Sequence, residues 1–75
     1  MKKKISLSVH QADLVSVLLF LADEGQLNLV IDGDVRGSVT TELKGVTVQD
    51  ALKALIATYQ LDASVDGCVL NARMR

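Results

Sequence analysis

The 75-residue sequence contains no proline, one cysteine (Cys68) and two aromatic residues, Phe20 and Tyr59. A single cysteine excludes a disulfide within the chain. Two aromatic side chains provide no platform on which nucleic-acid bases could stack. Eight basic and nine acidic residues give a formal charge of -1, so the positive surface that binds phosphate backbones or anionic membranes is missing too. These absences argue against nucleic-acid binding.

What the sequence does contain is aliphatic side chains, which make up most of a hydrophobic fraction of 49%. This fraction can supply a core for one small domain, whereas a two-domain enzyme needs a longer chain. We predict that residues 1–75 form a single domain, with a core at about 4–72, that belongs to a larger protein.

The charged start at Met1–Lys4 resembles the beginning of a signal peptide, and Leu14–Ala22 is an apolar run of matching length. Polar residues separate the two segments, and Asp23 and Glu24 follow where small residues would precede a cleavage site. The apolar run is also shorter than the ~20 residues that cross a membrane as a helix. We therefore expect neither a signal peptide nor a membrane span.

Alternating apolar and polar residues and clusters of turn residues predict five strands. The first strand is predicted at Ile5–Val9, and the second and third flank the turn at 32–37. Asp66 and Gly67 between two apolar runs are a strong signal for a hairpin. The four later strands are predicted at 28–31, 38–43, 62–65 and 68–72.

Two helices are predicted between these strands, at 13–24 and 48–59. Asp13 is suited to cap the first helix, and Gly25 stands where a left-handed residue would end it. Thr47 and Asp50 resemble a capping box at the start of the second helix. Both helices are apolar around most of their circumference, so each must be covered from several sides.

These elements predict an α+β fold made of two βαβ-type units. The two helices are expected to lie between a mixed three-stranded sheet and a C-terminal two-stranded hairpin. In the mixed sheet, a right-handed crossover would make the first two strands parallel, with the third strand antiparallel between them. The first strand, at Ile5–Val9, would then lie at an edge of its sheet.

An internal similarity recurs at an offset of 34 residues. It aligns Leu18 with Leu52 and Asp13 with Thr47, and it extends to the turns that end the two units. Two copies are too few for a solenoid. We interpret the similarity as two related strand-helix-strand units, the alternative being chance similarity between two amphipathic segments.

No catalytic, cofactor-binding or metal-binding residue is predicted. Asp32 and Asp34 resemble the start of a calcium loop, but Arg36 occupies a position that needs an oxygen ligand. His10 and Cys68 are too few for a zinc site, and no third residue orients them as a base and a nucleophile. Asp23 and Glu24 are neighbours on a helix and point in different directions, so they are not a carboxylate pair.

The predicted binding site is the free edge of the first strand. Its outward residues are small or polar, and neither a central charge nor a proline discourages the addition of a partner strand. The alternative is an ordinary edge that a neighbouring domain covers. Val30 and Val35, expected outward or on a loop, are secondary candidates. The candidate partner-binding residues are Ile5, Ser6, Leu7, Ser8, Val9 and His10.

The order of these segments resembles a known family. The strings Ile5-Ser6-Leu7-Ser8-Val9, Ala12-Asp13-Leu14-Val15-Ser16-Val17-Leu18, Leu27-Asn28-Leu29-Val30-Ile31-Asp32, Asp34-Val35-Arg36-Gly37-Ser38-Val39-Thr40 and Leu43-Lys44-Gly45-Val46-Thr47-Val48-Gln49-Asp50-Ala51-Leu52 resemble the short N-terminal domain (STN domain) shared by bacterial secretins and TonB-dependent transducers. The resemblance covers residues 4–72 and is stronger to the secretin branch, although secretins tend to carry a bulkier residue at Val48.

This resemblance implies a non-enzymatic, periplasmic protein-interaction domain of an outer-membrane secretin channel, of the type IV pilus or type II secretion kind. It implies contacts with inner-membrane components of the machine and with neighbouring subunits in a ring-forming homo-oligomer, the isolated domain being monomeric. The alternative in the same family is a signalling domain of a TonB-dependent transducer that contacts an anti-sigma regulator. An RNA-binding KH-like domain is disfavoured because the Gly-x-x-Gly loop is missing.

Overall fold

The computed structural model describes residues 4–75, so Met1–Lys3 of the charged start lie outside the described residues. Five strands and two helices follow one another in the order that the sequence predicts. They are β1 (Lys4–Asp13), α1 (Leu14–Glu24), β2 (Asn28–Ile31), β3 (Ser38–Thr47), α2 (Val48–Thr58), β4 (Leu61–Asp66) and β5 (Val69–Met74).

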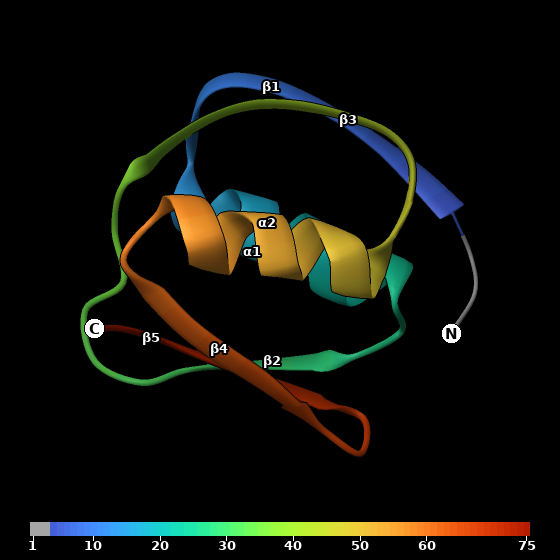
Figure 1. Ribbon diagram of the computed structural model, residues 1–75. Helices are drawn as coiled ribbons and strands as arrows, with labels where there is room; N and C mark the ends of the chain where they lie inside the picture. The colour runs from blue at the N-terminus through green and yellow to red at the C-terminus, as the bar shows by residue number, and fades with distance from the viewer. Residues whose placement is uncertain (1–3) are drawn as a thin grey trace.

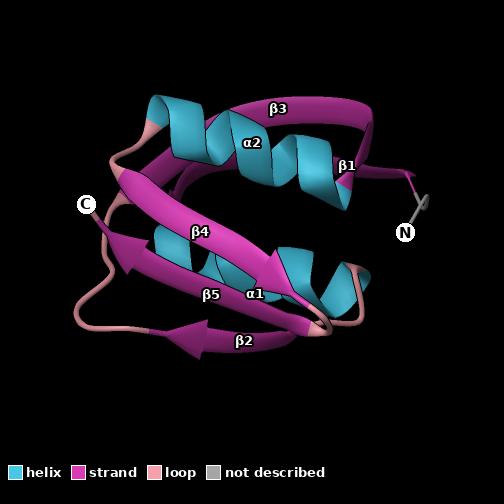
Figure 2. Ribbon diagram, turned by 60° about the horizontal axis from the view of Figure 1, so that its bottom comes forward, coloured by secondary structure: helices cyan, strands magenta, loops and turns pink. Residues whose placement is uncertain are grey.

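The elements form three layers, with the two helices between two sheets (Figure 1). One sheet is the antiparallel pair β1-β3. The other is mixed, with the strand order β2-β5-β4, in which β2 is parallel and β4 antiparallel to β5 (Figure 2). The predicted α+β fold is confirmed, with two helices between a mixed three-stranded sheet and a two-stranded sheet, but the two-stranded sheet is not the predicted C-terminal hairpin.

The predicted distribution of strands over the two sheets is wrong. The sequence analysis placed the first three strands in one sheet, whereas β2 joins the C-terminal hairpin and pairs with β5. The helices explain this arrangement, because a helix that is apolar on several sides needs cover from both layers. Each unit therefore places its first strand on one side of the helix layer and its second strand on the other side.

Side-chain caps begin both helices as predicted. The carboxylate of Asp13 accepts a hydrogen bond from the backbone N–H of Ser16, and the hydroxyl of Thr47 accepts one from the N–H of Asp50. The predicted left-handed residue after α1 is wrong, because Gly25 has φ -88° and the left-handed residue is Gln26, with φ 56°. In this turn the backbone N–H of Leu27 donates a hydrogen bond to the carbonyl of Ala22 at 2.7 Å.

The two strand-helix-strand units repeat at the predicted offset. β3 and α2 begin and end 34 residues after β1 and α1. The backbone irregularities coincide as well, since Gln11 in β1 and Gly45 in β3 both have positive φ, 53° and 63°. The pairing of β1 with β3 is symmetric about its central pair, Ser8 and Glu42. Lys4 pairs with Thr47 at one end, and the residues that are equivalent to them in the repeat, Ser38 and Asp13, pair at the other end. The structure supports the interpretation of an internal repeat.

The core fills the space between the layers and draws on every element. Leu18 and Leu21 of α1, Leu55 of α2 and Leu61 and Leu70 of the mixed sheet are fully or almost fully buried. Among the residues described, no polar or charged side chain is buried. Neither helix in residues 4–75 is long and apolar enough to cross a membrane.

The helices are not covered as completely as the sequence predicts. Leu19 and Phe20 of α1 are 53% and 39% exposed, so one side of this helix faces solvent. The reason is that two sheets cover a helix from two sides, and its outer flank stays open. Val35, predicted to lie outward or on a loop, lies in the loop between β2 and β3, but its side chain is buried in the core and is therefore not a candidate for partner binding. Val30 is 47% exposed, as predicted.

Candidate partner-binding edge

β1 lies at an edge of its sheet, as the sequence predicts, because β3 is the only strand that pairs with it within residues 4–75. Ile5 and Leu7 point into the core, and Val9 is half-buried. Ser6, Ser8 and His10 are exposed on the opposite face. The structure therefore places the six predicted residues on one strand, with one row of backbone groups facing away from β3.

The free edge of β3, unlike that of β1, is hydrogen-bonded to a tyrosine side chain, which we call a guard. The backbone N–H of Thr40 in β3 donates a hydrogen bond to the hydroxyl of Tyr59 at 3.1 Å. The repeat places Gly25, which has no side chain, at the position in the first unit that corresponds to Tyr59. The edge of β3 is thus occupied at Thr40 by a side chain of its own unit. Residues 4–75 provide no equivalent guard for β1 at Ser6.

The orientation of the backbone at Ser8 follows from the same hydrogen bond. Thr40 and Glu42 are two residues apart on β3, so their N–H groups point the same way, away from β1. Glu42 lies directly opposite Ser8, and directly opposed residues of an antiparallel pair exchange either two hydrogen bonds or none. The N–H and C=O of Ser8 therefore face the free edge, where an added strand would bind them.

An open groove runs beside this edge, between β1 and α1. Most of the residues that line it are apolar, and one of them, Phe20 of α1, has 39% of its surface exposed. An added strand could therefore pair with β1 and place every second side chain in the groove. The lining residues are Ser6, Leu7, Ser8, Val9, Ala12, Ser16, Val17 and Phe20.

The remaining polar residues singled out by the sequence do not form a reactive site. His10 lies on β1 and Cys68 in the turn between β4 and β5, on opposite sides of the helix layer, so they are not brought together. Arg36 pairs with Asp34 at 2.8 Å in the exposed turn. Residues 4–75 contain no cluster of three His, Cys, Asp or Glu side chains that could hold a metal ion.

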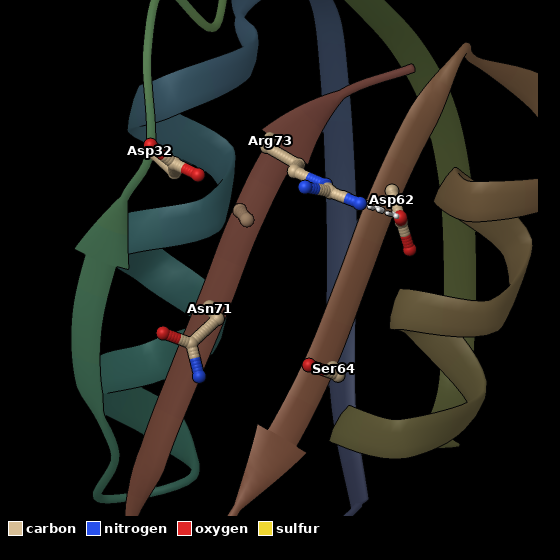
Figure 3. Close-up of a pocket in the computed structure, with 6 residues that line it drawn as sticks. Asp32, Asp62, Ser64, Asn71 and Arg73 are labelled. Atoms are coloured by element: carbon tan, nitrogen blue, oxygen red, sulfur yellow. Dashed lines mark hydrogen bonds and ion pairs between the residues drawn. The ribbon is translucent and has the colours of Figure 1, made fainter.

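A second hollow lies on the outer face of the mixed sheet and is polar. Arg73 of β5 reaches across to Asp62 of β4 at 3.4 Å, with Asn71, Ser64 and Asp32 nearby (Figure 3). The side chains of this ion pair are 62% and 50% exposed, so the pair contributes little to stability. No histidine or cysteine lines the hollow, and we interpret it as a solvated sheet face.

Comparison with known proteins identifies relatives of this chain. The chain is 38% identical over 68 residues to the fimbrial assembly protein PilQ of Pseudomonas aeruginosa. It is 32% identical over 73 residues to the type IV pilus biogenesis and competence protein PilQ of Neisseria meningitidis, and 32% over 69 residues to the DNA utilization protein HofQ of Escherichia coli K12. The chain is a homologue of the PilQ and HofQ secretins.

These secretin matches cover 91%, 97% and 92% of the chain but 10%, 10% and 17% of the respective relatives. The chain thus spans less than a fifth of their length. A solved structure of the N0 domain of the type II secretin from enterotoxigenic E. coli matches the fold, with a TM-score of 0.77 over 96% of this chain and 95% of that one, at 10% identity. No family model matches the sequence.

The homology confirms the predicted resemblance to secretins, and with it the periplasmic face of the outer membrane as the location. Secretin N-terminal domains are structural, which agrees with the prediction of a non-enzymatic domain. The alternative of a signalling domain from a TonB-dependent transducer, and the STN name, receive no support from these relatives.

Sequence analysis missed four residues that line the groove, Ala12, Ser16, Val17 and Phe20, and it also missed Tyr59 at the edge of β3. Phe20 was assigned to a fully covered helix, although it lies on the side of α1 away from the buried Leu14, Leu18 and Leu21. Its helical position relative to that stripe could have revealed it. Tyr59 had no sequence signal as a guard of β3, because its role depends on a contact across the fold.

Proposed function

We propose that this chain is a protein-interaction domain of an outer-membrane secretin of the type IV pilus or type II secretion kind. It binds an inner-membrane component of the machine by adding a strand of that partner to β1. It also packs beside copies of itself in the ring of the full-length protein. The proposal assigns no catalysis to the domain.

The observation that carries this proposal is the pairing of an unguarded strand edge with an apolar groove. Strand addition needs free N–H and C=O groups for affinity and pockets for alternate side chains for specificity. The edge at Ser8 supplies the first, and the groove between β1 and α1 supplies the second. The exposed face of β1 carries Ser6, Ser8 and His10, so the expected partner is a neutral strand with alternating apolar residues.

We expect Phe20→Asp to weaken binding of the partner at least about tenfold, because it places a charge at the wall of an apolar groove that the partner desolvates. The measurement is isothermal titration calorimetry with the purified periplasmic domain of an inner-membrane pilus component from the same organism. Phe20 is partly exposed, so the variant should keep its fold, which circular dichroism checks.

The matched control is Leu19→Asp. Leu19 is the neighbouring residue on α1, is 53% exposed, and does not line the groove. We expect this variant to bind the partner as tightly as the unchanged chain. Equal losses for the two variants, or no loss for Phe20→Asp, would place the contact away from the groove.

A further inference from the structure

The two-stranded sheet has two free edges, and the internal repeat makes them equivalent. β1 and β3 lie side by side over the helix layer (Figure 1). Thr40 and Glu42 of β3 follow Ser6 and Ser8 of β1 by the repeat offset of 34 residues, and all four side chains are exposed. Because the two strands pair symmetrically, each turns one row of backbone groups away from the other. An added strand therefore meets the same backbone geometry at both edges.

The guard on the β3 edge is anchored at both ends. The hydroxyl of Tyr59 accepts the hydrogen bond from the N–H of Thr40 at 3.1 Å. Tyr59 directly follows α2, and its own backbone N–H donates to the carbonyl of Leu55 at 2.9 Å. Its side chain is half-buried and packs against the core. A strand that added to β3 would have to break the bond at Thr40 and displace this ring.

The guarded residue is also held from the side of β1. The side-chain hydroxyl of Thr40 accepts a hydrogen bond from the backbone N–H of Gln11 at 2.9 Å. Gln11 is the left-handed residue at the register shift between Val9 and Ala12. This bond does not involve Tyr59, so loss of the tyrosine leaves Thr40 in place with its N–H pointing to the free edge.

The guard changes what a partner strand gains at each edge. At Ser6 the added strand forms a hydrogen bond with a group that otherwise binds water, whereas at Thr40 it replaces a bond that the chain already makes. The second difference is an ion pair between Lys44 and Glu42 at 3.7 Å on the exposed face of β3. Both side chains are mostly exposed, so solvent screens their charges. The tyrosine is therefore the larger barrier to strand addition.

We propose that Tyr59 directs the partner strand to β1, and that β3 carries a second strand-addition site which this tyrosine closes. This rests on the proposed function, since it explains which of two equivalent edges the partner takes. The occupant of both sites is the same partner strand, because main-chain hydrogen bonds supply the affinity of strand addition. In the unchanged chain the partner binds once, at β1.

The test moves the binding site from one edge to the other. Ser8→Pro closes the β1 edge, because it removes an N–H that faces outward. Tyr59→Ala opens the β3 edge, because it removes both the ring and the hydroxyl. Isothermal titration calorimetry with the purified periplasmic domain of an inner-membrane pilus component is carried out on the unchanged chain, on each variant and on the double variant. Circular dichroism checks the fold of each.

We expect one binding site in the unchanged chain, none in Ser8→Pro, two in Tyr59→Ala and one in the double variant. The double variant should bind the partner at least about tenfold more tightly than Ser8→Pro alone. Amide hydrogen exchange at Thr40 should slow when the double variant is saturated, which locates the new site on β3.

Two outcomes separate this proposal from the β1 site. Loss of binding in Ser8→Pro with no gain from Tyr59→Ala, or a gain without protection of Thr40, would overturn the guard and leave the β1 site standing. Full affinity in Ser8→Pro would overturn both, because the partner would then not use β1.

Tyr59→Phe covers the case in which Tyr59→Ala loses its fold. Phenylalanine keeps the packing of the ring against the core and removes the hydroxyl, so the N–H of Thr40 is released and should exchange faster in the free chain. In the Ser8→Pro background this variant should restore binding as well. The matched control is Thr58→Ala, an exposed position next to Tyr59 at the end of α2, which should restore none. Equal effects of Thr58→Ala and Tyr59→Phe would contradict the assignment to the tyrosine hydroxyl.

Discussion

Leu18→Ala is expected to lower the free energy of unfolding by about 2–5 kcal/mol. Leu18 has no exposed surface and lies in the cluster that joins both sheets to the helices. Truncation removes the buried side chain and leaves a cavity that the surrounding layers fill only in part. A domain of this size is stable by only about 4–11 kcal/mol, so the variant should approach the limit of folding.

The adjacent residue provides the control for this loss. Leu19 is 53% exposed on the same helix, and Leu19→Ala should change the free energy of unfolding by no more than about 0.5 kcal/mol. Urea denaturation followed by circular dichroism measures both variants. Similar losses for the two leucines would show that the layers bury α1 in another orientation.

Ser8→Pro should abolish partner binding and leave most of the stability of the domain intact. Proline removes the N–H at Ser8, which faces the free edge and is opposite Glu42 without hydrogen bonds between them. A proline at an edge position whose N–H faces outward removes no hydrogen bond from the ladder. The free energy of unfolding should fall by less than about 1 kcal/mol, whereas affinity for the partner should fall at least about a hundredfold.

Val9→Pro is the matched control for stability. Val9 follows Ser8 and lies directly opposite Thr41. Because hydrogen-bonded and non-hydrogen-bonded pairs alternate along an antiparallel ladder, and Ser8 and Glu42 form a non-hydrogen-bonded pair, the N–H of Val9 points to β3. Losing that ladder hydrogen bond should cost about 1–3 kcal/mol. If Ser8→Pro destabilised the domain as much as Val9→Pro, the free edge would lie on the other side of β1; if it kept full affinity, strand addition at this position would be wrong.

Much of the fold could be predicted because local signals and the global arrangement agree. The caps at Asp13 and Thr47 mark the starts of both helices, and Asp66-Gly67 marks the last hairpin. β1 and β3 are longer than predicted because Gln11 and Gly45 take left-handed conformations that let each strand continue past an irregularity. Left-handed glutamine is uncommon, so the sequence carried no warning of it.

The pairing of β2 could not be read from its own residues. Its four residues carry no register signal that distinguishes β3 from β5 as a neighbour, and a parallel partner is distant along the chain. The choice depends on how both units share two layers of cover for the helices. The repeat held the missing information, since equivalent strands of the two units must occupy equivalent layers.

The candidate site, like the fold, could be predicted from the sequence only in part. The free edge at Ile5–Val9 was predictable, because the sequence analysis placed the third strand between the first two and so left the first at an edge. The groove was not, because it exists only once α1 lies beside β1 with Phe20 turned outward. The guard at Tyr59 depends on a hydrogen bond between residues 19 positions apart, which no local pattern encodes.

Amide hydrogen exchange of Ser8 and Ser6, with and without the periplasmic domain of the inner-membrane component, is the most direct measurement of the central claim. Strand addition at β1 should slow exchange at both amides on saturation, because their N–H groups become hydrogen-bonded to the partner. Thr40, already bonded to Tyr59, should change little. Unaltered exchange at Ser8 and Ser6 in a saturated complex, with new protection on β4, would contradict the account.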